Sequence, residues 1–420
     1  MPSRRIYLDY AAATPVDLRV RRAMEPFFAG AFGNPGSLHA FGQEAIAAVD
    51  RSRGTIARLL GADFREIIFT ASATEANNLA LRGAFAAARR GGFPDAGRCP
   101  KIIVSAIEHE SVMETARALE REGAEMVIAP VDRAGVLDLA AFSRLIDDRT
   151  ILVSVMQANN EIGTVQPIAE IGRILAAFRA DGVVRPLRGN LPRGSHPSRW
   201  PLFHTDAAQG ILFLDASARN LGVDLMTLSS HKLYGPKGAG VLYIAQRGSV
   251  DYPIAPVVFG GGQEFGLRSG TENVPAVVGF AAAVEIAAAA RSKEGKRLKG
   301  LRAALWRGIG TFAPDARVNG IVPGRDDAGA LPGILNIYFP GCDAGELLTR
   351  LDLAGVAVSA GSACAARSPE PSPVIRAIAP SEPVRARASI RFSMGRHSTG
   401  GEITRCLKIL RQCLSRNPQP

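Results

Sequence analysis

Short apolar runs alternate with segments of helical periodicity through most of this chain. The stretches EIIFTASATEANNLALRGAFAAARRG, KIIVSAIEHESVMETARALEREG and TILVSVMQANNEIGTVQPIAEIGRILAAF each pass from a run of strand length, through polar residues, into a helical pattern. This order is typical of βα units, which form a mostly parallel sheet with helices on its faces. Ligands of such α/β folds bind beyond the carboxyl ends of the strands, so we expect the polar clusters to meet there.

The pattern changes after about residue 290. The later stretches KRLKGLRAALWRGI, GILNIYF, GELLTRLDLAGVAVS and SIRFSMGR mix helix and strand without regular βα order. We therefore expect a large α/β domain over 15–290 and a smaller α+β domain formed by 1–14 and 291–420. Residues 181–201 are rich in Pro, Gly and Arg and lack periodicity, so we interpret them as an exposed loop inserted in the large domain.

Composition narrows the classes of function. We see no apolar run of about 18–20 residues, the length of a membrane span, and no apolar stretch of signal-peptide length at the N-terminus. The five cysteines are too scattered for a disulfide framework or a zinc knuckle. The net charge of +11 is spread along the chain, so we interpret it mainly as compositional bias. We expect a cytoplasmic protein with no bound metal, no membrane contact and no direct contact with nucleic acid.

The stretch SSHKLYGPKG surrounds Lys232 with polar and turn-forming residues. Two serines and a histidine precede this lysine, and a Gly-Pro turn follows it. A desolvated lysine loses pKa and becomes a nucleophile for aldehydes. The commonest such aldehyde in enzymes is pyridoxal 5'-phosphate, so this stretch predicts a covalent site for that cofactor.

The cofactor requires further groups, and the chain offers a candidate for each. Its phosphate needs a helix N-terminus and hydroxyls, its ring nitrogen needs a carboxylate, and its ring favours an imidazole stack. The candidates are Ala73, Thr74, Ser229 and His231 for the phosphate, Asp206 for the ring nitrogen, Gln209 for the ring hydroxyl, and His109 for the stack. Singly, such residues are more often a helix cap, a turn residue or a packed histidine. Together on successive βα units they favour the cofactor site.

With these residues, the chain resembles the class V aminotransferase family of fold-type-I pyridoxal-phosphate enzymes, and within it the cysteine desulfurases of the NifS/IscS type. The resemblance is carried by YLDYAAATP, FGNPGSLH, EIIFTASATEANNLA, EHESV, NNEIGTVQPI, HTDAAQ, SSHKLYGPKGAGVLY, GGGQEFGLRSGTENV, VSAGSACAARSPEPSPVIRAI and SIRFSMGR, which span nearly the whole chain. The motifs depart from the family at Ser72, where glycine is more usual.

The resemblance implies a mostly parallel sheet of seven-stranded type and a Schiff-base role for Lys232. It places His231 and Ser229 on the phosphate, and Asn160 near the ring hydroxyl and the substrate. It also implies a homodimer in which Thr271 reaches the phosphate of the other subunit. Asn34, in FGNPGSLH, and Arg391, in SIRFSMGR, would contact the substrate.

Two features favour cysteine as the substrate, because the fold alone does not fix the chemistry. Cys364 lies in SAGSACAAR, a run of small residues suited to a thiolate that accepts sulfur. Arg391 has no acidic neighbour in sequence and suits a substrate carboxylate. For the other cysteines, Cys99, Cys342, Cys406 and Cys413, we favour the ordinary interpretation of a small apolar residue.

The implied reaction converts L-cysteine to L-alanine. Lys232 moves the Cα proton, His109 takes the thiol proton, and Cys364 carries the sulfur as a persulfide. The acceptor would be an iron–sulfur scaffold or a sulfur-carrier protein. A selenocysteine lyase or another class V aminotransferase or lyase remains the alternative, and a non-catalytic assembly subunit is the rival from a different class.

Overall fold

The computed structural model describes residues 5–90, 99–180, 200–247, 251–324, 327–361 and 371–415. Its centre is a sheet of seven strands in the order β2-β8-β7-β6-β5-β3-β4. The strands are β2 (Ile67–Thr70), β3 (Lys101–Ser105), β4 (Glu125–Ala129), β5 (Thr150–Ser154), β6 (Leu202–Asp206), β7 (Leu225–Ser229) and β8 (Gly240–Ile244). The pairs from β4 through β7 are parallel, whereas β8 runs antiparallel to both β7 and β2. The predicted α/β class with a mostly parallel seven-stranded sheet is confirmed.

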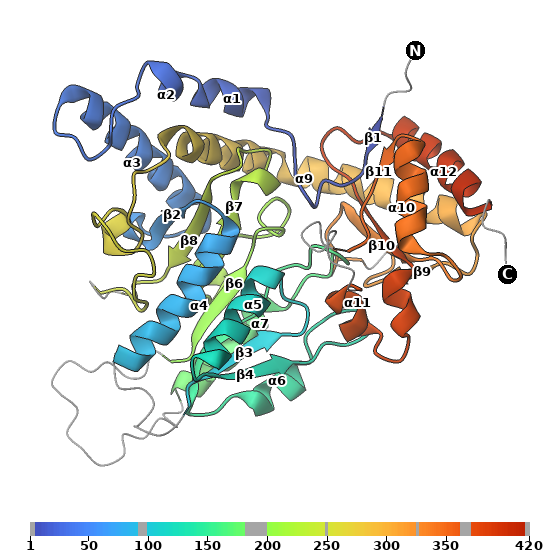
Figure 1. Ribbon diagram of the computed structural model, residues 1–420, viewed down its shortest axis with the longest axis horizontal. Coiled ribbons are helices and arrows are strands. Elements are labelled where there is room, and N and C mark those ends of the chain that lie inside the picture. The colour runs from blue at the N-terminus through green and yellow to red at the C-terminus, as the bar shows by residue number, and fades with distance from the viewer. Residues whose placement is uncertain are drawn as a thin grey trace.

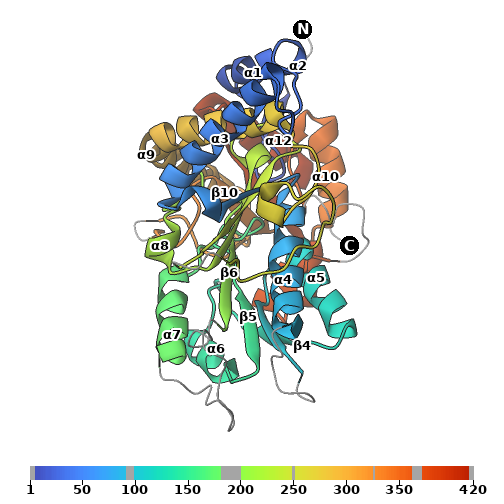
Figure 2. The same cartoon turned by 90° about the vertical axis from the view of Figure 1, so that its left-hand side faces the viewer.

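Helices cover both faces of this sheet (Figures 1 and 2). One face carries α4 (Ala73–Arg90) and α5 (Glu110–Arg121), and the other carries α3 (Ala40–Leu60), α7 (Ile168–Ala180) and α8 (Ala218–Leu221). Strands β3, β5 and β6 of the parallel part are fully buried, which explains the apolar runs in β3 and β5, whereas the edge strand β4 is partly exposed. The remaining helices of this part are α1 (Leu18–Met24), α2 (Pro26–Ala29) and α6 (Leu139–Leu145).

A smaller layer of strands and helices follows at the C-terminal side (Figure 1). Its three-stranded antiparallel sheet has the order β12-β10-β9, and a two-stranded parallel sheet pairs β1 with β11. The elements are β1 (Ile6–Tyr7), β9 (Arg317–Asn319), β10 (Ile334–Tyr338), α10 (Ala344–Leu353), β11 (Val356–Ala357), α11 (Pro373–Ile378), β12 (Ser389–Ser393) and α12 (Gly400–Ser415). The N-terminus therefore packs with the C-terminal part of the chain.

The long helix α9 (Val274–Gly310) connects the two layers. The expected domain boundary at 290 falls inside this unbroken helix, and the division into domains stays a prediction. The expectation that no stretch has the length of a membrane span is wrong for α9, whose best 18-residue window has a mean hydropathy of 1.6. Half of that window is buried inside the protein, and the helix packs along α1, α3 and α12. These contacts are those of a core helix, whose apolar composition serves tertiary packing.

The parallel strands place their carboxyl ends at one edge of the sheet. His109 follows β3, Asn160 lies in the loop after β5, Asp206 ends β6, and Lys232 comes directly after β7. Because parallel strands share one direction, residues separated by up to 123 positions meet at this edge. The inserted loop predicted at 181–201 lies, except for its last two residues, outside the described residues.

Candidate active site

A cavity of about 160 Å³ lies beyond the carboxyl ends of the strands. It is lined by Ala11, Ala12, Ser72, Ala73, Thr74, His109, Ser111, Met156, Ala158, Asn160, Asp206, Ala208, Gln209, Ser229, His231, Lys232 and Arg391. The lining contains nearly all residues that the sequence predicts for the cofactor and the substrate. The exceptions are Thr271 and Asn34, which are exposed and lie outside the lining, and Cys364, which lies outside the described residues.

The amine of Lys232 is held by the N-terminal segment. Its Nζ donates to the carbonyl oxygens of Ala11 at 2.6 Å and Ala12 at 2.8 Å. These residues are more than two hundred positions away in sequence, so the pairing depends on the tertiary structure. The amine therefore lies at the cavity wall between the two layers of the molecule.

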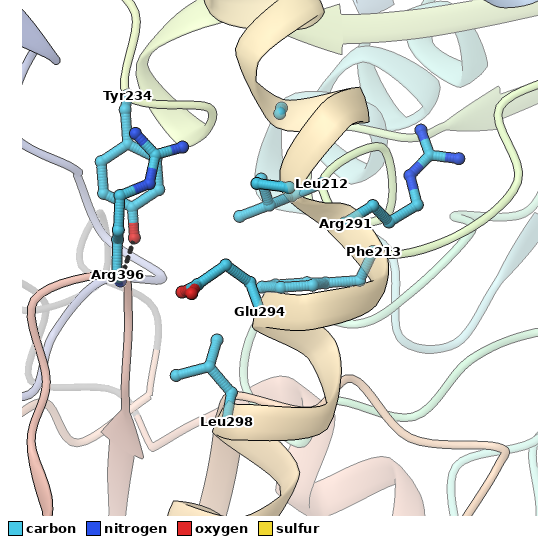
Figure 3. Close-up of a pocket in the computed structure, with 9 residues that line it drawn as sticks. Leu212, Phe213, Tyr234, Arg291, Glu294, Leu298 and Arg396 are labelled. Atoms are coloured by element: carbon cyan, nitrogen blue, oxygen red, sulfur yellow. Dashed lines mark hydrogen bonds between the residues drawn. The ribbon is translucent and has the colours of Figure 1, made fainter.

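The turn after Lys232 is locked by packing. Tyr234 adopts a left-handed φ of 64°, which is strained for a residue with a side chain. Its hydroxyl accepts a hydrogen bond from the backbone N–H of Arg396 at 2.6 Å, and the Arg396 guanidinium lies 4.2 Å from its ring centroid (Figure 3). A Cβ on Gly235 would lie 2.2 Å from the Ser230 hydroxyl, so only glycine fits there. The Gly-Pro turn thus fixes the backbone that carries the lysine.

A small hollow lies behind this turn. It has a volume of about 10 Å³ and is lined by Leu212, Phe213, Tyr234, Ala287, Ala290, Arg291, Glu294, Leu298 and Arg396 (Figure 3). This volume is at the lower limit for one water molecule. The hollow is therefore a packing defect beside α9 and too small for a cofactor.

Ser229 and His231 form a polar pair on the wall next to Lys232. The Ser229 Oγ and the His231 Nδ1 are 2.9 Å apart. Burial, followed by the positive charges of Lys232 and Lys237, lowers the pKa of His231 to about 4. The imidazole is therefore neutral at pH 7, and one ring nitrogen can donate while the other accepts.

The N-terminus of α4 also lines the cavity. The Ser72 Oγ accepts from the Glu75 N–H at 3.1 Å, and the Glu75 carboxylate accepts from the Ala71 N–H at 3.0 Å. Serine in place of the family's glycine therefore caps this helix. Gly240 is close behind, where a Cβ would lie 2.6 Å from the Ser72 carbonyl carbon. The first-turn N–H groups near Ala73 and Thr74 lack intrahelical acceptors, which suits an anion.

Asp206 and His109 are joined by residues that the sequence interpretation did not single out. The Asn77 Nδ2 donates to the Asp206 Oδ2 at 2.8 Å and to the Ser111 Oγ at 2.8 Å. The Ala208 N–H donates to the other oxygen of Asp206 at 2.9 Å. The sequence held one signal, since Asn77 is a polar residue on the buried face of α4. The Asp206 carboxylate is therefore fixed by two donors while remaining on the cavity wall.

The ring of His109 is fixed in one tautomer. Its Nδ1 accepts from the backbone N–H of Ser111 at 3.1 Å and lies 2.8 Å from the Ser111 hydroxyl. Because a backbone N–H can only donate, Nδ1 is an acceptor and the proton of the neutral ring is on Nε2. In this tautomer Nε2 carries a proton that it can donate, and the expected uptake of a thiol proton by His109 stays a prediction.

Arg391 is buried in β12, with 1% of its surface exposed. Its guanidinium donates to the Asp9 Oδ1 at 2.7 Å and to the Asn160 carbonyl oxygen at 3.0 Å. The sequence interpretation missed Asp9, because 382 positions separate the two residues. Among the residues that the structure describes, the buried Arg391 Nε has no hydrogen-bond partner, and an unpaired buried donor is unfavourable. A carboxylate entering the cavity would supply the missing acceptor.

Two acids beside the cavity were also missed. Burial raises the pKa of Glu108 to about 8, although the Ser105 hydroxyl and the Met156 N–H donate to its Oε1 at 2.7 and 2.6 Å. Burial likewise raises the pKa of Glu161, against a hydrogen bond from Ser372 and the charge of Arg391. The sequence could have indicated them only by their positions, because Glu108 directly precedes His109 and Glu161 directly follows Asn160.

Gln209, predicted to bind the ring hydroxyl of the cofactor, makes another hydrogen bond in this structure. Its Nε2 donates to the Ala11 carbonyl oxygen at 2.9 Å, so this amide helps to hold the segment that also binds Lys232. The arrangement as a whole offers an amine, an anion cradle, a fixed carboxylate and a buried guanidinium around one cavity. Within the described ranges, no group of three or more His, Cys, Asp or Glu side chains is placed to hold a metal ion.

Comparisons with known proteins find similar sequences and structures over nearly the whole chain. The family model described as aminotransferase class-V matches residues 6–187 and 191–406. Cysteine desulfurase IscS of Escherichia coli O139:H28 is 42% identical over 414 residues, covering 98% of this chain and 93% of that protein. The solved structure of a NifS-like protein has a TM-score of 0.83 at 35% identity, covering 98% of this chain and 99% of that one. The structure of SspA in complex with cysteine has a TM-score of 0.73 at 33% identity, covering 94% and 100%.

Proposed function

The chain belongs to the class V aminotransferase family, and on that premise we propose that it is a pyridoxal-phosphate-dependent cysteine desulfurase. Its reaction converts L-cysteine to L-alanine and carries the sulfur as a persulfide on Cys364. The observation that carries the proposal is the cavity that gathers Lys232, Asp206 and Arg391 from three separated stretches of the sequence. The full-length similarity to cysteine desulfurases selects this reaction among those of the family.

The residues around the cavity fit pyridoxal 5'-phosphate. The α4 N-terminus at Ala73 and Thr74, the Ser229 hydroxyl and the neutral His231 suit its phosphate. The Asp206 carboxylate suits its ring nitrogen, and Lys232 is the amine that would bond its aldehyde. When bound, this cofactor supplies an electron sink that weakens the bonds at Cα and Cβ of an amino acid.

The chain's own groups have distinct tasks. Asp206 would hold a proton on the ring nitrogen of the bound cofactor, and the Asn77 and Ala208 donors keep its carboxylate in place. Lys232 takes and returns the Cα proton of the substrate at Nζ, which the Ala11 and Ala12 carbonyls hold at the cavity wall. His109 donates from Nε2, in the tautomer that Ser111 fixes.

Arg391 selects a substrate that has a free carboxylate. Its buried Nε–H has no partner among the described residues, so an α-carboxylate would satisfy it. Its contact with the Asn160 carbonyl holds the guanidinium beside the cavity. An amino acid whose carboxylate binds Arg391 would thus lie in the cavity that Lys232 also lines.

Sulfur transfer requires a protein thiol, and Cys364 is our candidate from the sequence. Its thiolate attacks the substrate sulfur, an S–S bond forms, and the Cβ–S bond breaks. The electron pair stays on the substrate carbon, which gains a proton and becomes the methyl group of alanine. Atoms balance, since cysteine and an enzyme thiol yield alanine and an enzyme persulfide.

We also infer a cytoplasmic homodimer that delivers sulfur to an iron–sulfur scaffold or a sulfur-carrier protein. This part rests on the resemblance and on the Escherichia coli protein's name. Thr271 and Asn34 are exposed in the single chain, as residues that serve a neighbouring subunit or a closing substrate site would be. A selenocysteine lyase, which would act without Cys364, is the alternative.

The test is single-turnover reaction of the purified holoenzyme with L-cysteine. We expect alanine and a persulfide on Cys364, identified by mass spectrometry after alkylation. Cys364→Ser should still change the cofactor's absorption spectrum on adding cysteine but form no persulfide, whereas Cys342→Ser, a matched control, should behave as the wild type. Normal alanine release by Cys364→Ser would favour the lyase alternative, and no alanine from the wild type would refute the proposed function.

A further inference from the structure

Glu161 is a buried acid for which the proposed chemistry has no use. It directly follows the cavity residue Asn160, and only 3% of its surface is exposed. A buried carboxyl group costs free energy unless hydrogen bonds stabilise it. Its own backbone is also fixed, since the Asn159 Oδ1 accepts from the Glu161 N–H at 2.8 Å and the Asn336 Nδ2 donates to its carbonyl at 3.1 Å.

Two segments meet at the Glu161 carboxylate. The Ser372 hydroxyl donates to its Oε2 at 2.6 Å. Gly361 lies against the same oxygen, because a Cβ built on it would be 3.5 Å away. Gly361 has a φ of 99°, a conformation that residues with side chains rarely adopt, so the backbone at this position favours glycine. Gly361 and Ser372 flank residues 362–370, which include Cys364 and lie outside the described residues.

The segment before Cys364 is joined to the substrate arginine. Ser359 and Arg391 exchange two backbone hydrogen bonds, of 3.1 and 2.6 Å. The Ser359 hydroxyl also donates to the Gly361 carbonyl at 3.2 Å. The course of the chain up to Gly361 is therefore set by the strand that carries Arg391.

The segment after Cys364 is joined to the other side of the cavity. Ser372 caps α11, since its Oγ accepts from the Ile375 N–H at 3.1 Å. The apolar face of α11 packs in one cluster with Ile107, Met156 and Ile162, from the loops that follow β3 and β5. Glu161 is thus the point at which the two flanks of Cys364 and the loop carrying Asn160 come together.

We propose that Glu161 is a positioning residue for sulfur transfer, which holds Gly361 and Ser372 beside Asn160 so that Cys364 reaches the substrate sulfur. This inference rests on the proposed function and adds to it a group that touches neither cofactor nor substrate. Its contribution is to the S–S bond-forming step, in which the Cys364 thiolate must approach the substrate sulfur with the right geometry. A misplacement of about 1 Å at such a step costs roughly 100-fold in rate.

The experiment compares Glu161→Ala, Glu161→Gln and Ser372→Ala with the wild-type holoenzyme. Ser217→Ala is the matched control, because Ser217 also caps a helix, α8, but does not line the cavity. Four quantities are measured: the absorption of the bound cofactor, the Kd for L-alanine by spectral titration, the single-turnover rate of persulfide formation on Cys364, and the alkylation rate of Cys364 by iodoacetamide without substrate.

We expect Glu161→Ala to slow persulfide formation by roughly 10- to 100-fold, with cofactor absorption, alanine affinity and alkylation rate unchanged. Ser372→Ala should show a smaller loss of the same kind, and Ser217→Ala none. Glu161→Gln should retain most of the rate, because its amide oxygen still accepts from Ser372. If Glu161→Ala does not fold, Ser372→Ala carries the test.

A wild-type persulfide rate in Glu161→Ala, or in Ser372→Ala where Glu161→Ala fails to fold, would overturn the inference. Loss of alanine affinity in parallel with the rate would also overturn it, because Glu161 would then support the cavity as a whole. A failure of the proposed function would be recognised separately, because the wild type itself would then form no persulfide.

Discussion

At the scale of single residues, the position of Lys232 depends on contacts from distant parts of the chain. The carbonyls of Ala11 and Ala12 bind its amine, and the strained Tyr234 fixes the turn that follows it. Strain of this kind persists only where the surrounding structure enforces it. The Arg396 contacts on both the ring and the hydroxyl of Tyr234 provide that enforcement.

Borohydride reduction of the wild-type holoenzyme should attach the cofactor to Lys232. Lys232→Ala should lose this attachment while still folding and binding the cofactor through its phosphate, because the α4 N-terminus and Ser229 are unchanged. Peptide mass spectrometry locates the label. Lys237→Ala, which alters an exposed lysine of the same stretch, is the control and should keep the label. A label on Lys237 in the wild type would contradict the assignment.

Glu108 should make stability depend on pH. Burial raises its folded-state pKa to about 8 from an ordinary value of 4.5. The folded protein therefore keeps a proton that the unfolded chain loses, and the stabilisation present below pH 4.5 is lost as pH rises toward 8. The slope is at most about 1.4 kcal/mol per pH unit for one proton.

Glu108→Gln should remove this slope, because the amide keeps the shape of the neutral acid and does not titrate. Urea unfolding of the apoprotein at several pH values between 5 and 8 measures it. The wild type should lose stability relative to the variant as pH rises. Parallel curves for the two proteins would show that Glu108 is ionised in the folded state.

At the scale of elements, the N-terminus of α4 combines a helix cap with the anion cradle. The Ser72 hydroxyl accepts from the Glu75 N–H, and Arg268 binds the Glu75 carboxylate at 2.6 Å. The segment that leads to Thr271 is thereby joined to the same helix end. Side chains of Ser72 and Glu75 thus accept hydrogen bonds from some N–H groups at this helix end, and the remaining N–H groups are available for a phosphate.

Ser72→Ala should lower the free energy of unfolding by about 1 kcal/mol, whereas Ser72→Gly should lower it by only a few tenths. The reason is that glycine exposes the helix end to water, while alanine removes the acceptor and shields the end. Chemical denaturation measures both, and cofactor titration reports the cradle. Equal losses for the two variants would show that the Ser72 hydroxyl does not act as a cap.

At the scale of the whole molecule, the segment 28–41 carries apolar side chains that are exposed in the single chain. Phe28, Phe32, Leu38 and Phe41 are exposed by 66%, 66%, 93% and 52%, and the rings of Phe32 and Phe41 are 5.6 Å apart. Exposed clusters of this kind mark interaction surfaces. Since the resemblance implies a second copy, we predict that this segment lies at the subunit interface.

Sedimentation equilibrium should give a dimer for the wild type and a monomer for the double variant Phe32→Asp, Phe41→Asp. The variant should also bind the cofactor more weakly, because Thr271 of a neighbouring subunit would no longer reach the phosphate. Phe64→Asp, at a less exposed phenylalanine elsewhere on the surface, is the control and should remain dimeric. A double variant that stays dimeric would place the interface elsewhere.

The sequence alone determined the α/β class and most of the cavity wall. Alternating periodicity marks the βα units, and parallel strands must deliver Asp206, Lys232 and the α4 N-terminus to one edge of the sheet. Lys232, His231 and Asp206 could be predicted as site residues because cofactor chemistry demands these groups at strand ends, and all three line the same cavity. Local pattern was sufficient wherever a residue's role depends on its own strand or helix.

Only the tertiary structure decided which distant groups meet. Asp9 against Arg391, Asn77 against Asp206 and Glu161 against Ser372 each join residues more than a hundred positions apart. No periodicity encodes such pairs, because a buried charge or amide finds its partner through the packing of whole layers. The apolar stretch of α9 follows the same principle: its composition alone fits a membrane span, and only its contacts with α1, α3 and α12 identify it as a core helix.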